Sequence, residues 1–200
     1  MPHKKIKHSI TPFKTIRIKY KDLFDFKDFY SSLHFWFLEN GWRDKEDKDE
    51  HWETFYSERI SGGAREIWIR WRLTKPADGA DLTYYFDVDF HVLGLVKQEL
   101  IIDGKKIKVD NGEVDMNFSG YIEQNFKEKF EKHGLLKHVL ELFTKRVYEA
   151  TLEQRKKEFY QEAYALQNWI KRWFKLFRHL PYEESQSFYP SSARPSLKRE

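Results

Sequence analysis

Three polar residues at alternate positions of one segment are the strongest candidates for chemistry in this chain. Asp87, Asp89 and His91 occur where every second residue is apolar, so their side chains project from one face of a predicted strand. Two carboxylates and an imidazole on one face can hold a divalent cation, or they can act as acid and base. The spacing therefore allows a metal site or an acid-base site on a sheet surface.

Two arginines on the preceding predicted strand offer a structural alternative for the same residues. Arg70 and Arg72 have the facing of Asp87 and Asp89 if the two strands are neighbours. Cross-strand pairs of opposite charge then stabilise the sheet by roughly 0.2–1 kcal/mol each. We favour this ion-pair ladder, because alternation alone produces such a polar face. The sequence therefore predicts neither a metal site nor a cofactor.

Recognisable catalytic motifs are missing from the sequence. The chain has no Cys, and no Ser lies in a G-x-S-x-G elbow, so nothing indicates a covalent nucleophile. The pair Gly62-Gly63 indicates a turn, because neither spacing of a phosphate-binding glycine loop occurs around it. We therefore expect a non-catalytic protein.

The segment between Gly134 and Pro181 predicts a very long helix. It contains no Gly or Pro and is rich in strong helix formers, which favours helix from Leu135 to Leu180, either continuous or broken once. One apolar stripe ends near Ala150, and a second stripe with a different facing begins at Phe159. The polar residues from Glu153 to Glu158 separate the stripes, so we expect a kink or a solvent-bridging turn there.

The second stripe is the predicted interface of the protein. Its apolar members are Phe159, Leu166, Trp169, Ile170, Trp173, Phe174 and Phe177, and its basic members are Lys171, Arg172, Lys175 and Arg178. Such segregation suits packing on the chain's own sheet, docking on a second subunit or partner protein, or contact with an anionic membrane surface. The change of facing favours a partner, since one sheet covers a single continuous stripe more easily than two.

The remaining chain predicts an α+β domain with a twisted antiparallel sheet of about six strands. A helix should begin after the N-cap Asp25 and end at Asn40-Gly41. Alternation predicts strands over Thr15–Tyr20, Trp52–Ile60, Arg65–Lys75 and Leu82–Val92, around Ile107 and Val109, and over Val114–Phe118. Tight turns are predicted at Ser61-Gly62-Gly63, Asp103-Gly104 and Asn111-Gly112.

This order of elements resembles the helix-grip lipid-binding domains at the level of architecture. The resemblance implies that the aromatic face of the sheet and the helices enclose an apolar cavity, without implying a particular function. With 200 residues, we expect one domain with appendages. The predicted parts are a basic arm over 1–12, the α+β domain over 13–152, a projecting or kinked helix continuation over 153–180, and a flexible tail over 181–200.

Charge and hydropathy narrow the choice of partners. The 36 basic and 32 acidic residues give a net charge of +4, so no strong global field attracts nucleic acid. The basic start has no apolar run behind it, and no stretch approaches the ~20 apolar residues of a membrane span. We therefore expect a cytoplasmic protein, with a peripheral membrane contact as an alternative.

These observations predict a binding or assembly protein that self-associates or docks a partner protein through its C-terminal helix. One alternative is a helix-grip-like carrier or enzyme for an apolar ligand. Another is a factor associated with RNA or the ribosome, in which Trp68 and Tyr85 stack on bases beside Arg70 and Arg72. The carboxylates of Asp87 and Asp89 oppose that reading, because they repel phosphate.

Overall fold

The protein is an α+β fold built on one seven-stranded antiparallel sheet. The computed structural model describes residues 9–44, 51–77, 80–102, 105–127 and 148–176. The strands are β1 (Ser9–Ile10), β2 (Ile16–Phe24), β3 (Arg43–Asp44), β4 (Glu53–Ser61), β5 (Ala64–Pro76), β6 (Leu82–Ile102) and β7 (Lys105–Gln124), and the helices are α1 (Phe26–Glu39) and α4 (Glu149–Trp173). The α+β class and the antiparallel sheet predicted from the sequence are confirmed.

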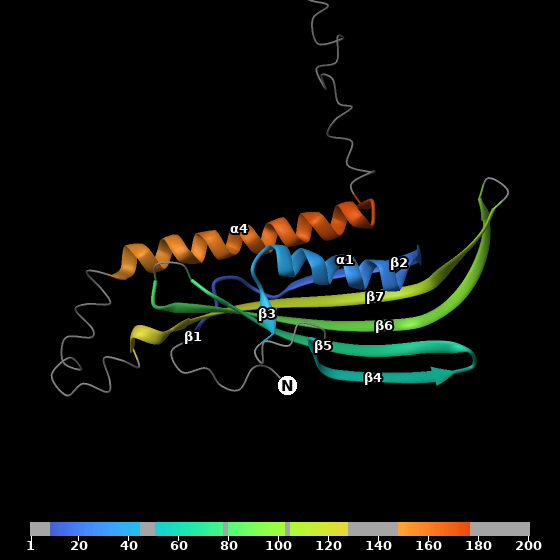
Figure 1. Ribbon diagram of the computed structural model, residues 1–200, viewed down its shortest axis with the longest axis horizontal. Helices are drawn as coiled ribbons and strands as arrows, with labels where there is room; N and C mark the ends of the chain where they lie inside the picture. The colour runs from blue at the N-terminus through green and yellow to red at the C-terminus, as the bar shows by residue number, and fades with distance from the viewer. Residues whose placement is uncertain (1–8, 45–50, 78–79, 103–104, 128–147, 177–200) are drawn as a thin grey trace, which may run out of the picture.

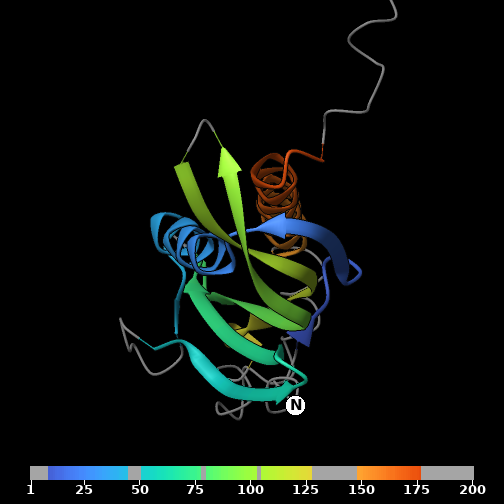
Figure 2. The ribbon, with the colours of Figure 1, turned by 90° about the vertical axis from the view of Figure 1, so that its right-hand side faces the viewer.

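The order of the strands places the longest ones in the middle of the sheet. From one side to the other, β7 pairs with β6, and β6 pairs with β5. Strands β1 and β2 pair with the free side of β7, while β3 and β4 pair with the free side of β5. Both helices lie on the same face of the sheet, and β4 forms its outermost strand opposite β2 (Figures 1 and 2).

Helix α1 begins and ends where its sequence predicts. The side chain of Asp25 accepts a hydrogen bond of 3.0 Å from the backbone N–H of Asp28, which caps the first turn. Gly41 follows the helix with a φ of +79°, a conformation that favours glycine. The apolar face of α1 contributes Phe29, Leu33 and Phe37 to the core. The predicted hairpin turn at Gly62-Gly63 is likewise confirmed, because Ser61 pairs with Ala64.

Helix α4 shows no break at Glu153–Glu158, where a kink is one of the expectations, while the first predicted apolar stripe lies mostly over 136–147, outside the described residues. Helix α4 is one α-helix that continues through Glu153–Glu158. Its buried residues share one stripe and belong to the same core as the sheet: they are Leu152, Phe159, Ala163, Leu166 and Ile170, followed after the helix by Phe174. The side chains of this stripe pack against aromatic rings of the sheet and of α1, which fill the space between α4 and the sheet. The apolar stripe of α4 is therefore buried in the chain's own core.

The end of α4 also differs from the prediction. The helix ends at Trp173, seven residues before Leu180, and Lys175 adopts a φ of +56° that closes the last turn. The backbone N–H of Lys175 bonds the carbonyl of Arg172 at 3.0 Å. Phe174 turns into the core, where its ring stacks on Tyr20 with centroids 4.1 Å apart. This contact explains why the chain leaves the helical path there.

A β-bulge in the middle of the sheet overturns the tight turn predicted at Asn111-Gly112. Both residues lie inside β7, where Asn111 pairs with Val96, and the register of β6 shifts between Leu93 and Val96. A Cβ on Gly112 would lie 3.1 Å from Cα of Leu95, so glycine serves the close approach of two strands rather than a turn. The alternation signal of strands β6 and β7 stops at this bulge, although both strands continue beyond it.

The bulge has a consequence for the shape of the sheet. Gly94 within it has a φ of +63°. Beyond the bulge β6 and β7 continue as an extension, Val96–Ile102 paired with Lys105–Asn111, which becomes two-stranded where β2 ends at Phe24. We call this extension the β6-β7 arm. The arm curves toward the side of the sheet that carries the helices (Figure 1). Bulges bend strands in this way because the extra residue increases the local twist.

Several predicted features lie outside the described residues. They are residues 1–8 of the basic arm, the turn at Asp103-Gly104, the helix start over 135–147, the interface residues Phe177 and Arg178, and the tail over 181–200. In the described part of the chain, neither helix combines the length and apolar character that crossing a membrane requires.

Candidate functional site

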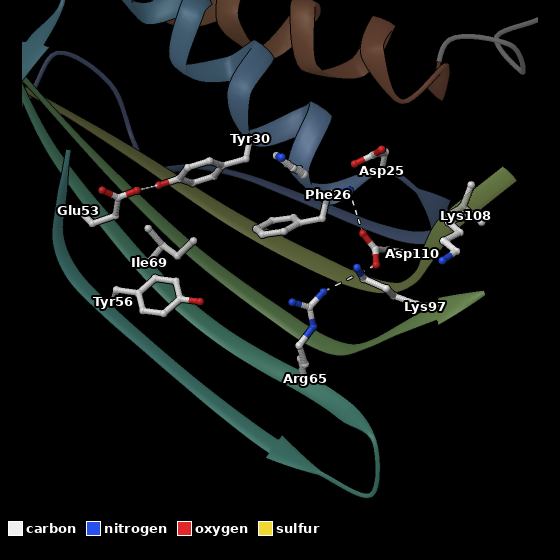
Figure 3. Close-up of a pocket in the computed structure, with 12 residues that line it drawn as sticks. Asp25, Phe26, Tyr30, Glu53, Tyr56, Arg65, Ile69, Lys97, Lys108 and Asp110 are labelled. Carbon is white, nitrogen blue, oxygen red and sulfur yellow. Dashed lines mark hydrogen bonds and ion pairs between the residues drawn. The ribbon is translucent and has the colours of Figure 1, made fainter. Parts of the chain in front are cut away.

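A cleft opens between the start of α1 and the helix-facing side of the sheet (Figure 3). Its volume is about 470 Å³, within the range of small-molecule sites in proteins. We call it the α1 cleft. Its lining residues are Asp25, Phe26, Lys27 and Tyr30 from the start of α1, Glu53 and Tyr56 from β4, Arg65 and Ile69 from β5, and Lys97, Lys108, Val109 and Asp110 from the β6-β7 arm.

The inner wall of the cleft is apolar and aromatic. Ile69 is buried in the floor, Phe26 and Tyr30 descend from α1, and Tyr56 closes the β4 side. Rings that cover both sides of a cavity suit a flat or apolar ligand body, because they offer large contact areas at low conformational cost. This half of the cleft can therefore bind an apolar or aromatic group.

A hydrogen-bond relay fixes the deep end of the cleft. The indole Nε1 of Trp71 donates a hydrogen bond of 2.9 Å to the hydroxyl oxygen of Tyr30, and that hydroxyl donates in turn to Glu53. Burial raises the pKa of the Tyr30 phenol, and the hydrogen bond to Glu53 raises it further, because it favours the protonated phenol. Tyr30 is therefore a neutral wall residue with a fixed orientation.

The other two carboxylates of the cleft hold the start of α1 in place. Asp25 caps the helix through its bond to the N–H of Asp28. Asp110 accepts a hydrogen bond of 3.3 Å from the N–H of Phe26 through Oδ2, while its Oδ1 lies 3.8 Å from Nη2 of Arg65. Both carboxylates are thus bonded to groups of the protein, and Asp110 ties the arm to α1 and to β5.

Unlike the carboxylates, which are bonded to groups of the protein, the lysines of the cleft are not bound to groups of opposite charge in the described part of the chain. Among the residues that the structure describes, Lys27, Lys97 and Lys108 form no ion pair, although all three line the cleft. Figure 3 shows Lys97 and Lys108 on the arm, on the same side of the cleft as Asp110. Because the acids are engaged and these ammonium groups are not, the mouth of the cleft favours a negatively charged group.

The described lining contains carboxylates, ammonium groups and phenols, and no Ser, Thr, Cys or His side chain. No group of three or more His, Asp or Glu side chains within the described ranges is arranged to hold a metal ion. The arrangement offers contact area at one end and positive charge at the other.

The polar residues predicted on the strands lie on the opposite side of the sheet from the cleft. Arg70 pairs with Asp89 and Arg72 with Asp87 in the register of β5 and β6. Nη2 of Arg72 lies 2.7 Å from Oδ1 of Asp89, and Nε of Arg72 lies 3.6 Å from Oδ1 of Asp87. Each carboxylate is therefore held by an arginine, as a cross-strand ladder requires.

His91 is separated from the two aspartates by its own partners. Its Nε2 lies 2.9 Å from Oε1 of Glu66, and its ring stacks on Trp68 with centroids 5.0 Å apart. The structure thus brings His91 to Glu66 on β5 instead of to Asp87 and Asp89. Tyr85, the second proposed stacking residue, donates a hydrogen bond of 2.6 Å to Glu123.

The predicted interface on the C-terminal helix is divided between the core and the surface. Phe159, Leu166, Ile170 and Phe174 are buried in the chain's own core, and Trp169 and Trp173 are partly buried against it. Arg172 and Lys175 are exposed, and Lys171 is partly exposed. The apolar half of the stripe is therefore covered by the chain's own fold, which is one of the three surfaces that its pattern suits.

Comparisons with known proteins give no family for this chain. No protein family, curated protein or solved structure matches it. The candidate site therefore rests on geometry alone.

Sequence reasoning missed the α1 cleft almost completely. Only Asp25 carries a recognisable signal, as an N-cap, and that signal concerns the helix and not a ligand. Lys97, Lys108 and Asp110 reach the cleft because the bulge bends the arm that carries them. The one available signal was the glycine pair Gly94 and Gly112, since isolated glycines within strand patterns indicate bulges.

Proposed function

We propose that this protein binds a small amphiphilic anion in the α1 cleft. The ligand has an apolar or aromatic body that lies between Phe26, Tyr56 and Ile69. Its anionic group lies at the mouth, near Lys97 and Lys108. This function belongs to the class of carriers and ligand sensors, and two helices on one face of a curved sheet support the helix-grip-like arrangement that such proteins use.

One observation carries the proposal. A cleft of about 470 Å³ joins an aromatic wall to three lysines that have no ion-pair partner in the described part of the chain. All three lysines are exposed to solvent, so their ammonium groups are accessible to an anionic ligand, which forms charge-assisted hydrogen bonds with them. Binding would therefore stabilise the fold as well as occupy the cleft.

The cleft lies in a different place from the cavity that a helix-grip architecture implies. The space between α4 and the sheet is filled, because the ring of Phe159 lies 5.6 Å from that of Trp42 and 5.1 Å from that of Tyr84. The opening lies instead beside the start of α1, where the β6-β7 arm curves out of the plane of the sheet toward the helices. Selectivity should consequently depend on the arm.

A matched pair of fluorescent probes tests the proposal. The anionic probe is 8-anilino-1-naphthalenesulfonate, and the neutral probe is N-phenyl-1-naphthylamine, which has the same rings without the sulfonate. We expect the anionic probe to bind more tightly to the unmodified protein. The double variant Lys97→Gln with Lys108→Gln should weaken its binding about tenfold, a loss of about 1.4 kcal/mol, and should leave the neutral probe unaffected.

The control is Lys106→Gln on the same arm. Lys106 lies outside the cleft and pairs with Glu99 at 3.8 Å, so its substitution removes one positive charge from the arm, against two in the double variant, without touching the site. Equal effects of the double variant and of the control on the anionic probe would contradict the proposal. Native mass spectrometry of the purified protein provides a second readout, because a bound anion should add a mass that the double variant loses.

Self-association stays a second proposal for this protein. The exposed apolar residues of the outermost strand β4 favour it, and the apolar stripe of α4 does not, because the core covers that stripe.

A further inference from the structure

Strand β4 is an open edge of the sheet. Eight of its nine residues pair with β5 along one side, with Thr54 at a register shift, and the other side pairs with no strand that the structure describes. Soluble proteins protect such edges with lysines, prolines or bulges, because free N–H and C=O groups recruit another strand. The segment ETFYSERIS contains no lysine and no proline, and its single register shift lies at its start, between Glu53 and Phe55. Among the described strands, none covers this edge, so most of its length is available for pairing.

Three of the nine side chains of β4 are large, apolar and exposed. Phe55 is 43% exposed, Tyr56 54% and Ile60 69%. These are three of the nine large hydrophobic residues found exposed in the described part of the chain. Apolar and aromatic side chains beside free backbone groups are the composition of a pairing surface, in which main-chain hydrogen bonds and side-chain burial act together.

We propose that two copies of this chain pair through their β4 strands, antiparallel and centred on Ser57, so that the two sheets become one. A two-fold axis perpendicular to the sheet keeps both helix-bearing faces on the same side, and it places residues of like facing opposite each other. With Ser57 at the centre, Phe55 of one copy lies opposite Arg59 of the other, and Tyr56 lies opposite Glu58.

These pairings repeat contacts that β4 already makes within one chain. The guanidinium of Arg70 lies 4.9 Å from the centre of the Phe55 ring, so a second arginine from the other copy extends the same cation-π arrangement. The hydroxyl of Tyr56 donates a hydrogen bond of 2.7 Å to Glu58 within one chain. In the dimer, the same carboxylate also lies opposite Tyr56 of the other copy. The sequence of β4 is therefore self-complementary in this register.

Neighbouring registers are less favourable. A centre on Glu58 places the two Glu58 carboxylates opposite each other, and a centre on Arg59 opposes two guanidinium groups. A centre on Tyr56 leaves Ile60, the most exposed apolar residue of the strand, without a β4 partner. Of these registers, the one centred on Ser57 alone places each exposed apolar residue of β4 opposite a β4 residue and avoids like charges.

The second copy is a better occupant than an unrelated peptide because both strands then bury the same exposed apolar residues. Pairing along a nine-residue edge buries less surface than the ~800 Å² per partner of a typical stable complex. We therefore expect a reversible dimer whose apparent mass rises with protein concentration. Because Phe55 and Ile60 do not line the α1 cleft, dimerisation and ligand binding can be tested independently.

Cysteine cross-linking of the full chain tests the register directly. The natural chain has no Cys, so a single introduced thiol can only join two copies. Opposed residues of antiparallel strands have Cα atoms ~4.5–5.5 Å apart, which a disulfide can span. Ser57→Cys should cross-link to a covalent dimer under mild oxidation. Ser61→Cys, at the other end of the same strand and opposite Glu53, should not.

Sedimentation velocity across a concentration series provides the second arm. The unmodified chain should shift from monomer to dimer, and Phe55→Lys with Ile60→Lys should remain monomeric. The control is Phe35→Lys with Ile101→Lys, which adds equal charge at exposed apolar residues away from β4 and should still dimerise. A monomer at every concentration would overturn the proposal. So would equal cross-linking of the two cysteine variants, which also decides the question if a lysine variant fails to fold.

Discussion

The indole Nε1 of Trp42 donates a hydrogen bond of 2.7 Å to Oε1 of Glu162, which joins the segment after α1 to the middle of α4. The same carboxylate receives Nζ of Lys75 from β5 at 3.0 Å, and that ammonium group lies 5.6 Å from the centre of the Trp42 ring. The side chain of Glu162 thus links α4 both to the segment after α1 and to the sheet. Trp42 is fully buried, so its N–H depends on this acceptor.

Removing the acceptor should destabilise the fold. Glu162→Ala leaves the buried indole N–H of Trp42 without a partner, and we expect the free energy of unfolding to fall by about 1–3 kcal/mol. Glu162→Gln keeps an acceptor and should cost less. Urea denaturation measures both. Glu153→Ala, an exposed position of the same helix that pairs with Lys156, should change stability by no more than ~0.5 kcal/mol, and a loss there as large as that of Glu162→Ala would contradict this role.

The close approach of α4 and the sheet should require glycine at position 120. A Cβ on Gly120 would lie 2.4 Å from Cζ of Phe13 and 2.8 Å from Cζ of Phe159, which is overlap. Gly120→Ala should therefore lower the free energy of unfolding by about 1–3 kcal/mol.

A double-mutant cycle provides the control for this prediction. Phe13→Leu removes the ring atoms nearest the added methyl, so the two substitutions together should cost less than the sum of their separate effects. Additive losses, measured by urea denaturation of the four chains, would show that the ring of Phe13 does not set the packing at Gly120.

His34 should make the stability of the fold depend on pH. Its Nε2 is buried and has no hydrogen-bond partner among the residues that the structure describes, and its ring lies 3.9 Å from that of Trp52. Burial lowers the pKa of His34, against a smaller opposing effect of Glu53. As the pH falls below about 6.5, His34 therefore takes up a proton in the unfolded chain before it does so in the folded chain. The stability that the folded chain gains from neutral His34 is complete above that pH, and it is lost as the pH falls through the folded pKa.

The variant His34→Phe tests this expectation. It keeps a ring against Trp52 and removes the nitrogen that has no partner, so its stability at pH 8 should equal or exceed that of the natural chain. The free energy of unfolding should fall less between pH 7 and pH 5 in the variant than in the natural chain. Parallel pH profiles of the two proteins would rule out His34 as the source.

The sequence determined the local elements because their signals come from neighbours along the chain. Alternation identified the faces of β5 and β6, and the N-cap Asp25 with Gly41 bounded α1. The pairing of Arg70 and Arg72 with two aspartates followed from facing alone, once the two strands became neighbours. Periodicity also predicted a single apolar stripe from Phe159 onward in the C-terminal helix, and Phe159, Leu166 and Ile170 of that stripe are buried in the core.

Tertiary structure alone decided what that helix contacts and where a ligand can bind. Whether Phe159 meets a partner or the chain's own sheet depends on Trp42 and Gly120, which are distant in sequence and leave the space for its ring. The α1 cleft exists because a bulge opposite Gly112 bends the arm that carries Lys97 and Lys108. Periodicity records which face a residue shares with its near neighbours. It holds no information about distant segments that pack against that face, so packing and the cleft emerge only when the chain folds.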